Sequence, residues 1–190
     1  MVEVGLGFVD KEPAMTATLH LADIPSESAA IPGASLSIRF RAFRPNRGAD
    51  AAAFRVLNEA RIQHCFDFEN RDDEMLLNSE SYITARGGHI FFAEADGDPI
   101  GCCALIPMQP GVYEVGKLAV AEVWRGRGIG RRLLSFVIAR ARSFGAVSLY
   151  FETTGKLAGA VHLYESLGFR HLPAGSPSNT RSNVFMEMPL

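Results

Sequence analysis

The chain has 190 residues, a length that favours one domain with at most an appendage. Hydrophobic residues make up 47% and charged residues 21%, ordinary values for a globular protein with a sizeable core. The formal net charge of −2 gives no overall basic field, so the composition disfavours a nucleic-acid partner. The 3 cysteines cannot all pair within one chain, which favours free thiols in a reducing compartment, the cytoplasm.

The first 35 residues differ from the rest of the chain. Segment 22–37 is rich in proline, serine and glycine and has weak hydrophobic periodicity, which is typical of a linker or a loosely held arm. We therefore expect an N-terminal extension at 1–35 and one domain at 36–190. The first lysine is Lys11 and no apolar stretch is long enough to cross a bilayer, so we expect neither a signal peptide nor a membrane span.

Hydrophobic periodicity predicts the elements of the domain. Alternation at 36–43 predicts a strand, helical spacing predicts a helix over 49–64, and a second, acidic helix is expected near 69–78. The further elements, in chain order, are strands at 90–94, 99–106 and 112–120, a helix at 128–144, a strand at 147–151, a helix at 158–167 and a strand at 183–188. Asp96-Gly97-Asp98 is a hairpin signal between two of these strands. The order indicates an α/β fold (α+β mixed), with helices on the faces of a mixed sheet.

A glycine-dense turn leads from the strand at 112–120 directly into the amphipathic helix at 128–144. Glycines let the backbone approach a ligand closely, and the first N–H groups of a helix lie at the positive end of its dipole. The turn therefore predicts a phosphate or pyrophosphate site. A dinucleotide-binding loop would require a third glycine where Arg131 stands, and a P-loop would require Gly-Lys-Ser/Thr, which does not follow these glycines.

The remaining pattern, Arg-x-x-Gly-x-Gly, is formed by Arg125, Gly128 and Gly130. It resembles the coenzyme A pyrophosphate loop of the GCN5-related N-acetyltransferases, the GNAT family. On this motif alone, a glycine-rich connection without a ligand stays open as the alternative. A second motif, Ala160 to Phe169, is similar to the family segment A-x-x-L-Y-x-x-x-G-F and begins 30 positions after Gly130. The resemblance covers roughly residues 36–190.

The resemblance implies a central mixed, mostly antiparallel twisted sheet of six to seven strands. About four helices would flank it, and it would splay between the fourth and fifth strands. Acetyl-CoA is implied as the acyl donor, with no metal ion. The residues implied to bind it are Leu118, Ala119, Val120, Arg125, Gly126, Arg127, Gly128, Ile129, Gly130, Arg131 and Tyr164. One position departs from the family pattern: Leu157 stands where many members have an asparagine that contacts the pantetheine arm.

Acyl transfer to an amine needs a base, and Glu114 is the candidate. Alternation along 112–120 would place Glu114, Gly116, Leu118 and Val120 on one face, opposite Tyr113, Val115, Lys117 and Ala119. Glu114 stands eleven residues before Arg125, the separation of the base glutamate in histone-type members of the family. The alternative is a glutamate at the solvated end of a strand.

The resemblance also implies an oxyanion site and a proton donor. Backbone N–H groups near Leu118 to Val120, at a bulge, would hold the oxyanion. The Tyr164 phenol would protonate the departing thiolate, and the alternative role is a core aromatic beside Val161 and Leu167.

Four arginines crowd the glycine turn. Arg125, Arg127, Arg131 and Arg132 would complement the coenzyme's phosphates, whereas Arg140 and Arg142 are expected on a solvated helix face. Cys102 and Cys103 are expected as small core residues, and the spacing of histidines and cysteines does not indicate a zinc site.

The predicted function is acetyl-CoA-dependent transfer of an acetyl group to a primary amine of a small molecule or peptide, by direct transfer in a ternary complex. The acceptor is expected to contact segments 54–68 and 173–184, with 176–181 as a lid and Arg181 suited to a carboxylate. The alternative is an acetyl-CoA-binding sensor or interaction module of the same fold without turnover. A homodimer is left open.

Overall fold

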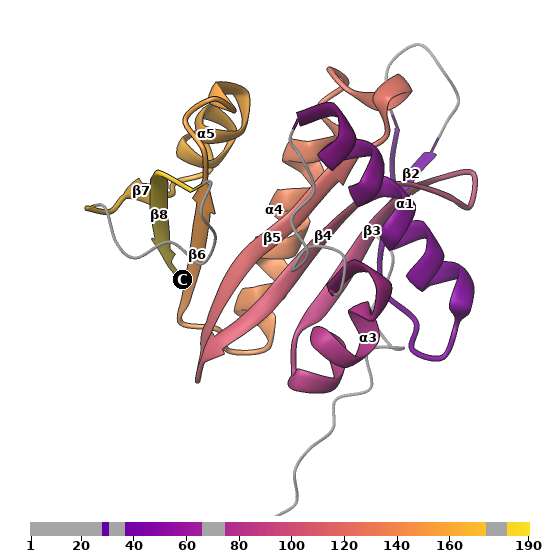
Figure 1. Ribbon diagram of the computed structural model, residues 1–190, viewed down its shortest axis with the longest axis horizontal. Coiled ribbons are helices and arrows are strands. Elements are labelled where there is room, and N and C mark those ends of the chain that lie inside the picture. The colour runs from indigo at the N-terminus through magenta and orange to yellow at the C-terminus, as the bar shows by residue number, and fades with distance from the viewer. Residues whose placement is uncertain (1–27, 31–36, 66–74, 174–181) are drawn as a thin grey trace, which may run out of the picture.

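A computed structural model describes residues 28–30, 37–65, 75–173 and 182–190 (Figure 1). Within these residues one eight-stranded sheet has the strand order β1-β2-β3-β4-β5-β6-β8-β7. The strands are β1 (Ser28–Ala30), β2 (Ser37–Ala42), β3 (His89–Ala95), β4 (Asp98–Gln109), β5 (Val112–Val120), β6 (Ser148–Thr153), β7 (Arg170–His171) and β8 (Val184–Pro189). The helices are α1 (Gly48–Cys65), α3 (Ser79–Tyr82), α4 (Ile129–Ser143) and α5 (Ala158–Glu165), with 3₁₀ turns η2 (Thr84–Arg86) and η3 (Glu122–Trp124).

These bounds confirm the predicted strands and three of the predicted helices. The acidic helix expected near 69–78 falls mostly outside the described residues, although 75–77 are helical. The extra strand relative to the expected six to seven is short: β1 pairs with β2 from within the segment predicted as an extension. The domain boundary at residue 35 stays a prediction.

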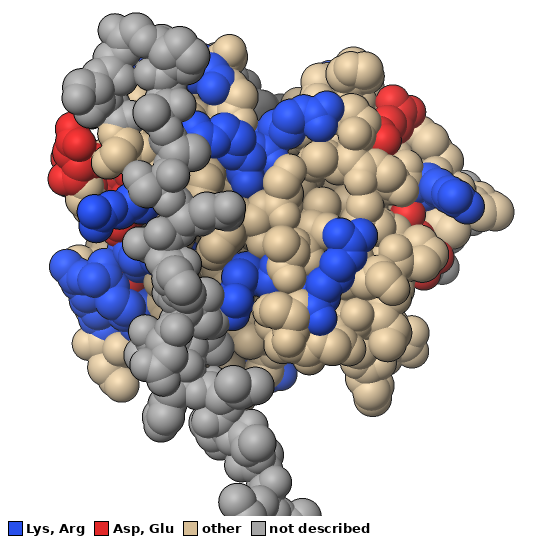
Figure 2. Space-filling model, turned by 180° about the vertical axis from the view of Figure 1, so that it is seen from behind, with Lys and Arg blue, Asp and Glu red and all other residues tan. Residues whose placement is uncertain are grey.

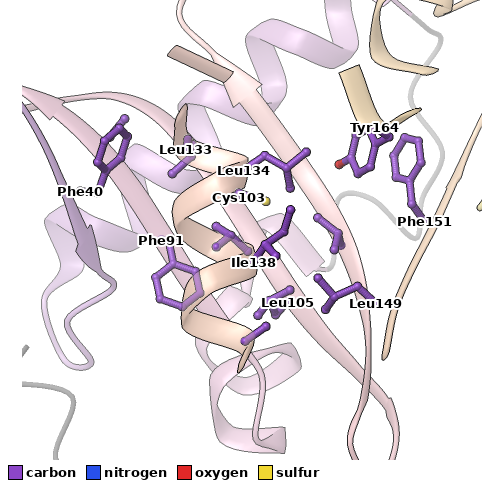
Figure 3. Close-up of a cluster of buried hydrophobic side chains, with 14 of the residues drawn as sticks. Phe40, Phe91, Cys103, Leu105, Leu133, Leu134, Ile138, Leu149, Phe151 and Tyr164 are labelled. Carbon is purple, nitrogen blue, oxygen red and sulfur yellow. The ribbon is translucent and has the colours of Figure 1, made fainter. Parts of the chain in front are cut away.

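The sheet is mostly antiparallel and separates two apolar layers. Figure 1 shows α1 and α3 on one face of the sheet and α4 on the other. Helical spacing predicts an apolar stripe on α4 that ends at Phe144. Phe144 lies just beyond the helix and packs partly buried on the same cluster, and the other members of the stripe are buried: Ile129, Leu133, Val137, Ile138 and Ala141. On the opposite face Phe54 and Leu57 of α1 pack on Phe92 of β3. Figure 3 shows the α4 layer, with Leu134 and Ile138 between α4 and the strands.

An ion-pair network anchors the first turn of α1 to the sheet. Asp50, only 2% exposed, accepts hydrogen bonds from both terminal nitrogens of Arg41, at 2.6 and 3.1 Å, and from the Arg44 backbone N–H at 2.9 Å. The Arg41 Nε also donates to Glu94 of β3. Burial alone raises the pKa of Asp50, but the bonds and charges of Arg41 and Arg44 lower it below its ordinary value. The network therefore links the start of α1 to β2 and β3.

Candidate active site

Among the described strands, β5 and β6 are the one pair of neighbours that run parallel. Val112 to Glu114 pair with Ser148 to Tyr150, and the register ends at the Glu114–Tyr150 pair. Counted from β2, these are the fourth and fifth strands, as the resemblance implied. Figure 1 shows β6, β8 and α5 diverging from β5 beyond this point. Main-chain groups in the second half of β5 are therefore not taken up by pairing with β6.

A β-bulge in β5 inverts the expected alternation of its side chains. Ala104 pairs with Gly116 and Cys102 with Ala119, so one β4 residue opposes two β5 residues, Lys117 and Leu118. Lys117 takes a left-handed conformation, with φ at 54°. An extra residue shifts every following side chain to the other face of the sheet.

The predicted facing of β5 is therefore wrong beyond Lys117. Val115 is buried in the α4 layer and Ala119 in the α1 layer, although alternation had placed them together. Leu118 and Val120 pack on the α4 side. Glu114 lies on the other side, where its carboxylate oxygen is 3.5 Å from the position a Cβ on Gly116 would take.

The predicted phosphate loop connects η3 to α4 through two left-handed glycines. Gly126 and Gly128 have φ of 72° and 75°, and a Cβ on either would meet nothing within 4 Å. Gly128 is the N-cap of α4, no side chain caps the helix there, and the first turn carries no acidic residue. The N–H groups of that turn have no acceptor within the helix, so the loop presents donors at the positive end of the dipole.

The four arginines near this loop differ in their contacts and exposure. Arg125 donates from Nε to the Val120 carbonyl at 3.1 Å, which ties the loop to the end of β5. The Arg127 guanidinium lies over the ring of Trp124, 5.0 Å from its centroid. Arg131 is exposed, whereas Arg132 lies over Phe40 of β2, 5.4 Å from its centroid. Figure 2 shows Lys and Arg side chains spread over the α4 face and acidic ones towards its edges.

Tyr164 of α5 is buried, with 1% of its surface exposed. Its ring stacks on Phe151 of β6 and meets Phe169 edge-on, at a centroid distance of 5.0 Å. Figure 3 shows its hydroxyl pointing away from Phe151, towards the side where Leu134 lies. The ring therefore has the buried position expected of a core aromatic, the alternative role for Tyr164. Its hydroxyl, however, points towards the β5 side.

The sequence analysis missed two polar side chains at the splay, those of Tyr150 and Glu152. Tyr150 pairs with Glu114 across the strands and donates its hydroxyl to the Glu152 carboxylate at 3.2 Å. Ser182 donates to the other oxygen of Glu152, also at 3.2 Å. Burial, then the charge and hydrogen bond of Glu152, then Glu114, raise the pKa of Tyr150 to about 12. Alternation along β6 places Tyr150 and Glu152 on one face, but only the pairing of β6 with β5 brings them beside Glu114.

Four further features of the sequence can be compared with the described residues. Cys102 and Cys103 are buried, as expected. No group of three or more potential metal ligands occurs in the described part of the chain. No described helix is long and apolar enough to cross a membrane. The predicted lid at 176–181, with Arg181, lies outside the described residues.

Comparison with known proteins decides the family. The acetyltransferase (GNAT) family matches residues 55–169, more than half of the chain. The chain belongs to this family. Acetyl transfer from acetyl-CoA is general to the GNAT family.

Similar curated proteins share about half of their length with this chain. The Escherichia coli (strain K12) uncharacterized N-acetyltransferase YjgM is 30% identical over 94 residues, covering 47% of this chain and 56% of that protein. The IAA acetyltransferase of Azospirillum brasilense is 36% identical over 100 residues, covering 52% of this chain and 65% of that protein.

Solved GNAT structures share the fold over most of the chain. A GNAT acetyltransferase from Staphylococcus aureus Mu50 has a TM-score of 0.69 at 21% identity, covering 80% of this chain and 98% of that one. YncA from Salmonella typhimurium, described as a putative acetyltransferase with its cofactor acetyl-CoA, has a TM-score of 0.61 at 24% identity, covering 82% and 94%.

Proposed function

We propose that this GNAT protein transfers the acetyl group of acetyl-CoA to a primary amine of a small molecule or peptide, directly and in a ternary complex. The observation that carries the proposal is the uncapped start of α4 behind two left-handed glycines, tied by Arg125 to the end of the splayed strand β5. A donor that binds its phosphates at this loop and extends along β5 has its thioester near the splay.

The residues present fit the phosphates of the donor. The first-turn N–H groups of α4 and the exposed Arg125, Arg127 and Arg131 supply hydrogen-bond donors and positive charge. The absence of side chains at Gly126 and Gly128 leaves the backbone open to an approaching pyrophosphate. Arg132 is not assigned a phosphate, because it lies over Phe40.

The acceptor amine must lose a proton before or during attack. A lysine-like amine with a pKa near 10.4 is almost entirely charged at neutral pH, and making it neutral costs about 4–5 kcal/mol. Glu114 stands at the vertex of the splay, and Glu152 adds a second carboxylate on the next strand. These carboxylates attract a cationic amine, and Glu114 accepts the proton as the N–C bond forms.

The remaining steps use the β5 backbone and Tyr164. Backbone N–H groups at Leu118 to Val120 stabilise the tetrahedral oxyanion as the amine attacks the thioester carbonyl. The C–S bond then breaks, and the Tyr164 hydroxyl protonates the leaving thiolate. Glu114 lies on the α1 side of β5, whereas Tyr164 packs in the α4 layer. Because the two side chains lie on opposite faces of the sheet, Glu114 can take the proton from the amine while Tyr164 gives a proton to the thiolate.

The experiment is thiol release from acetyl-CoA in the presence of a panel of primary amines, with mass detection of the acetylated product. The panel contains diamines, amines bearing a carboxylate and peptides with a free lysine or N-terminus. We expect thiol release with at least one cationic amine, in step with an N-acetylated product. A sensor of the same fold would instead bind acetyl-CoA in calorimetry and release no thiol above buffer, and that result would reject the proposal.

A further inference from the structure

The two adjacent cysteines of β4 contact the bulge of β5 from opposite faces of the sheet. The Sγ of Cys102 lies 3.6 Å from the carbonyl oxygen of Lys117, on the α1 side. The Sγ of Cys103 lies 3.8 Å from the carbonyl oxygen of Gly116, on the α4 side. A thiol is a weak donor, and both thiols are fully buried. Each thiol therefore contacts a carbonyl at the point where the bulge interrupts the regular ladder.

Asn58 of α1 extends this contact to a third element. It is fully buried, and its Nδ2 donates to the Phe54 carbonyl at 2.9 Å and to the Cys102 Sγ at 3.2 Å. If the amide were flipped, Oδ1 would face the Phe54 carbonyl oxygen, and two acceptors do not form a hydrogen bond. The nitrogen Nδ2 is therefore the atom that faces Phe54 and Cys102. The hydrogen bonds then run in one direction, from the Asn58 amide to the Cys102 sulfur and from the Cys102 S–H to Lys117.

The bulge needs support because its conformation is unfavourable for the residue that occupies it. Lys117 has a positive φ, which costs an L-residue with a Cβ roughly 1–2 kcal/mol. Local strain of this kind persists only where the surroundings hold it, and it gathers at functional sites. Burial raises the pKa of the Cys103 thiol, which keeps it protonated and able to donate.

We infer that Asn58, Cys102 and Cys103 are positioning residues for acetyl transfer, and we call them the bulge clamp. The clamp holds the backbone at 117–119, which overlaps the stretch from Leu118 to Val120 whose N–H groups are proposed to hold the oxyanion, and the clamp side chains are not assigned contacts with donor or acceptor. This inference rests on the proposed function, because the bulge matters to the rate only if these N–H groups stabilise an oxyanion. The clamp explains why α1, which lies on the acceptor side, is linked to the backbone of β5.

The test uses the full chain and three variants of the clamp. Cys102→Ala removes the donor to Lys117, Asn58→Leu removes the donor to Cys102, and Cys102→Ser restores a hydroxyl donor at the same place. Leu76→Ala is the matched control, because Leu76 is buried in the same apolar layer and lies outside the segments expected to contact the acceptor. Steady-state kcat and KM are measured together with hydrogen exchange of the backbone amides at 117–119.

We expect Cys102→Ala and Asn58→Leu to lower kcat about tenfold, as the loss of roughly 1.4 kcal/mol of oxyanion stabilisation implies, with a smaller change in the KM for acetyl-CoA. Amide exchange at 117–119 should rise in both, and Cys102→Ser should recover most of kcat. Leu76→Ala should lower the unfolding temperature but leave kcat and this exchange unchanged.

Unchanged exchange at 117–119 in both Cys102→Ala and Asn58→Leu would overturn the clamp, and so would a loss of kcat no larger than that of Leu76→Ala. The exchange measurement on coenzyme A-bound protein needs no turnover. If no amine is acetylated, the proposed function fails, and the exchange data still decide whether these residues hold the bulge.

Discussion

The ring of Tyr164 lies face to face with that of Phe151, with centroids 3.4 Å apart and planes 6° from parallel. The contact joins α5 to β6, the two elements on the far side of the splay from β5. It fixes the plane of the phenol, so the direction of the hydroxyl follows from the packing of the ring. Packing and chemistry at this residue can therefore be separated by substitution.

Tyr164→Phe should leave the fold intact and lower turnover. The ring contacts with Phe151 and Phe169 remain, so we expect the unfolding free energy to change by no more than about 1 kcal/mol. Loss of the proton donor should lower kcat by about 100-fold, the lower end for general acid catalysis. Phe151→Leu is the control: it should lower the free energy of unfolding and have a smaller effect than Tyr164→Phe on the kcat of folded protein. Full kcat in Tyr164→Phe would show that Tyr164 is only a core aromatic.

Glu114→Gln should slow acetyl transfer and change its pH dependence. The amide cannot accept the amine proton, so we expect kcat/KM to fall by about 100-fold and to lose the limb that depends on an ionised base. Glu187→Gln is a matched control, because Glu187 of β8 lies two strands from Glu114 and accepts a hydrogen bond from Ser148 that a glutamine can also accept. Equal pH profiles for wild type and Glu114→Gln would assign the base elsewhere.

Arg125→Ala and Arg131→Ala should weaken acetyl-CoA binding. Each removes an exposed guanidinium near the uncapped start of α4, and we expect about a tenfold rise in Kd for each, measured by calorimetry at fixed ionic strength. Arg125→Ala also removes the bond to the Val120 carbonyl, so its effect should be the larger. Arg142→Ala, at the exposed end of the same helix, should leave Kd unchanged. A Kd that responded equally to all three would indicate a diffuse charge effect.

His89 should make the stability of the fold depend on pH. Its ring stacks 4.4 Å from that of Phe144, and burial, followed by the charge of Arg140, lowers the pKa of His89 below its ordinary value of 6.5. The unfolded chain therefore binds a proton that the folded chain does not, so stability is full above pH 6.5 and declines as the pH falls below it.

The measurement is the unfolding temperature between about pH 8 and pH 5, where histidine is the main titrating side chain. His89→Phe keeps an aromatic ring beside Phe144 and removes the titration, so its unfolding temperature should fall less over this range. The same decline in both proteins would place the pH dependence in other groups.

Much of the fold and of the coenzyme loop followed from the amino-acid sequence alone. Period-2 alternation predicted β2, and the apolar stripe from Ile129 to Ala141 predicted α4, because both patterns depend on neighbours within one element. The left-handed Gly126 and Gly128 agree with the glycine requirement of the turn. Together with the segment around Tyr164, these features were sufficient to identify the GNAT family.

Only the tertiary structure decided which residues meet at the splay. The facing of Glu114 relative to Leu118 depends on an extra residue at Lys117, and a bulge is a property of two paired strands that periodicity along one strand does not reveal. Tyr150 comes beside Glu114 through the parallel register, and Asn58 reaches Cys102 from 44 positions away. Local patterns determined the elements, whereas contacts between distant segments determined the candidate site.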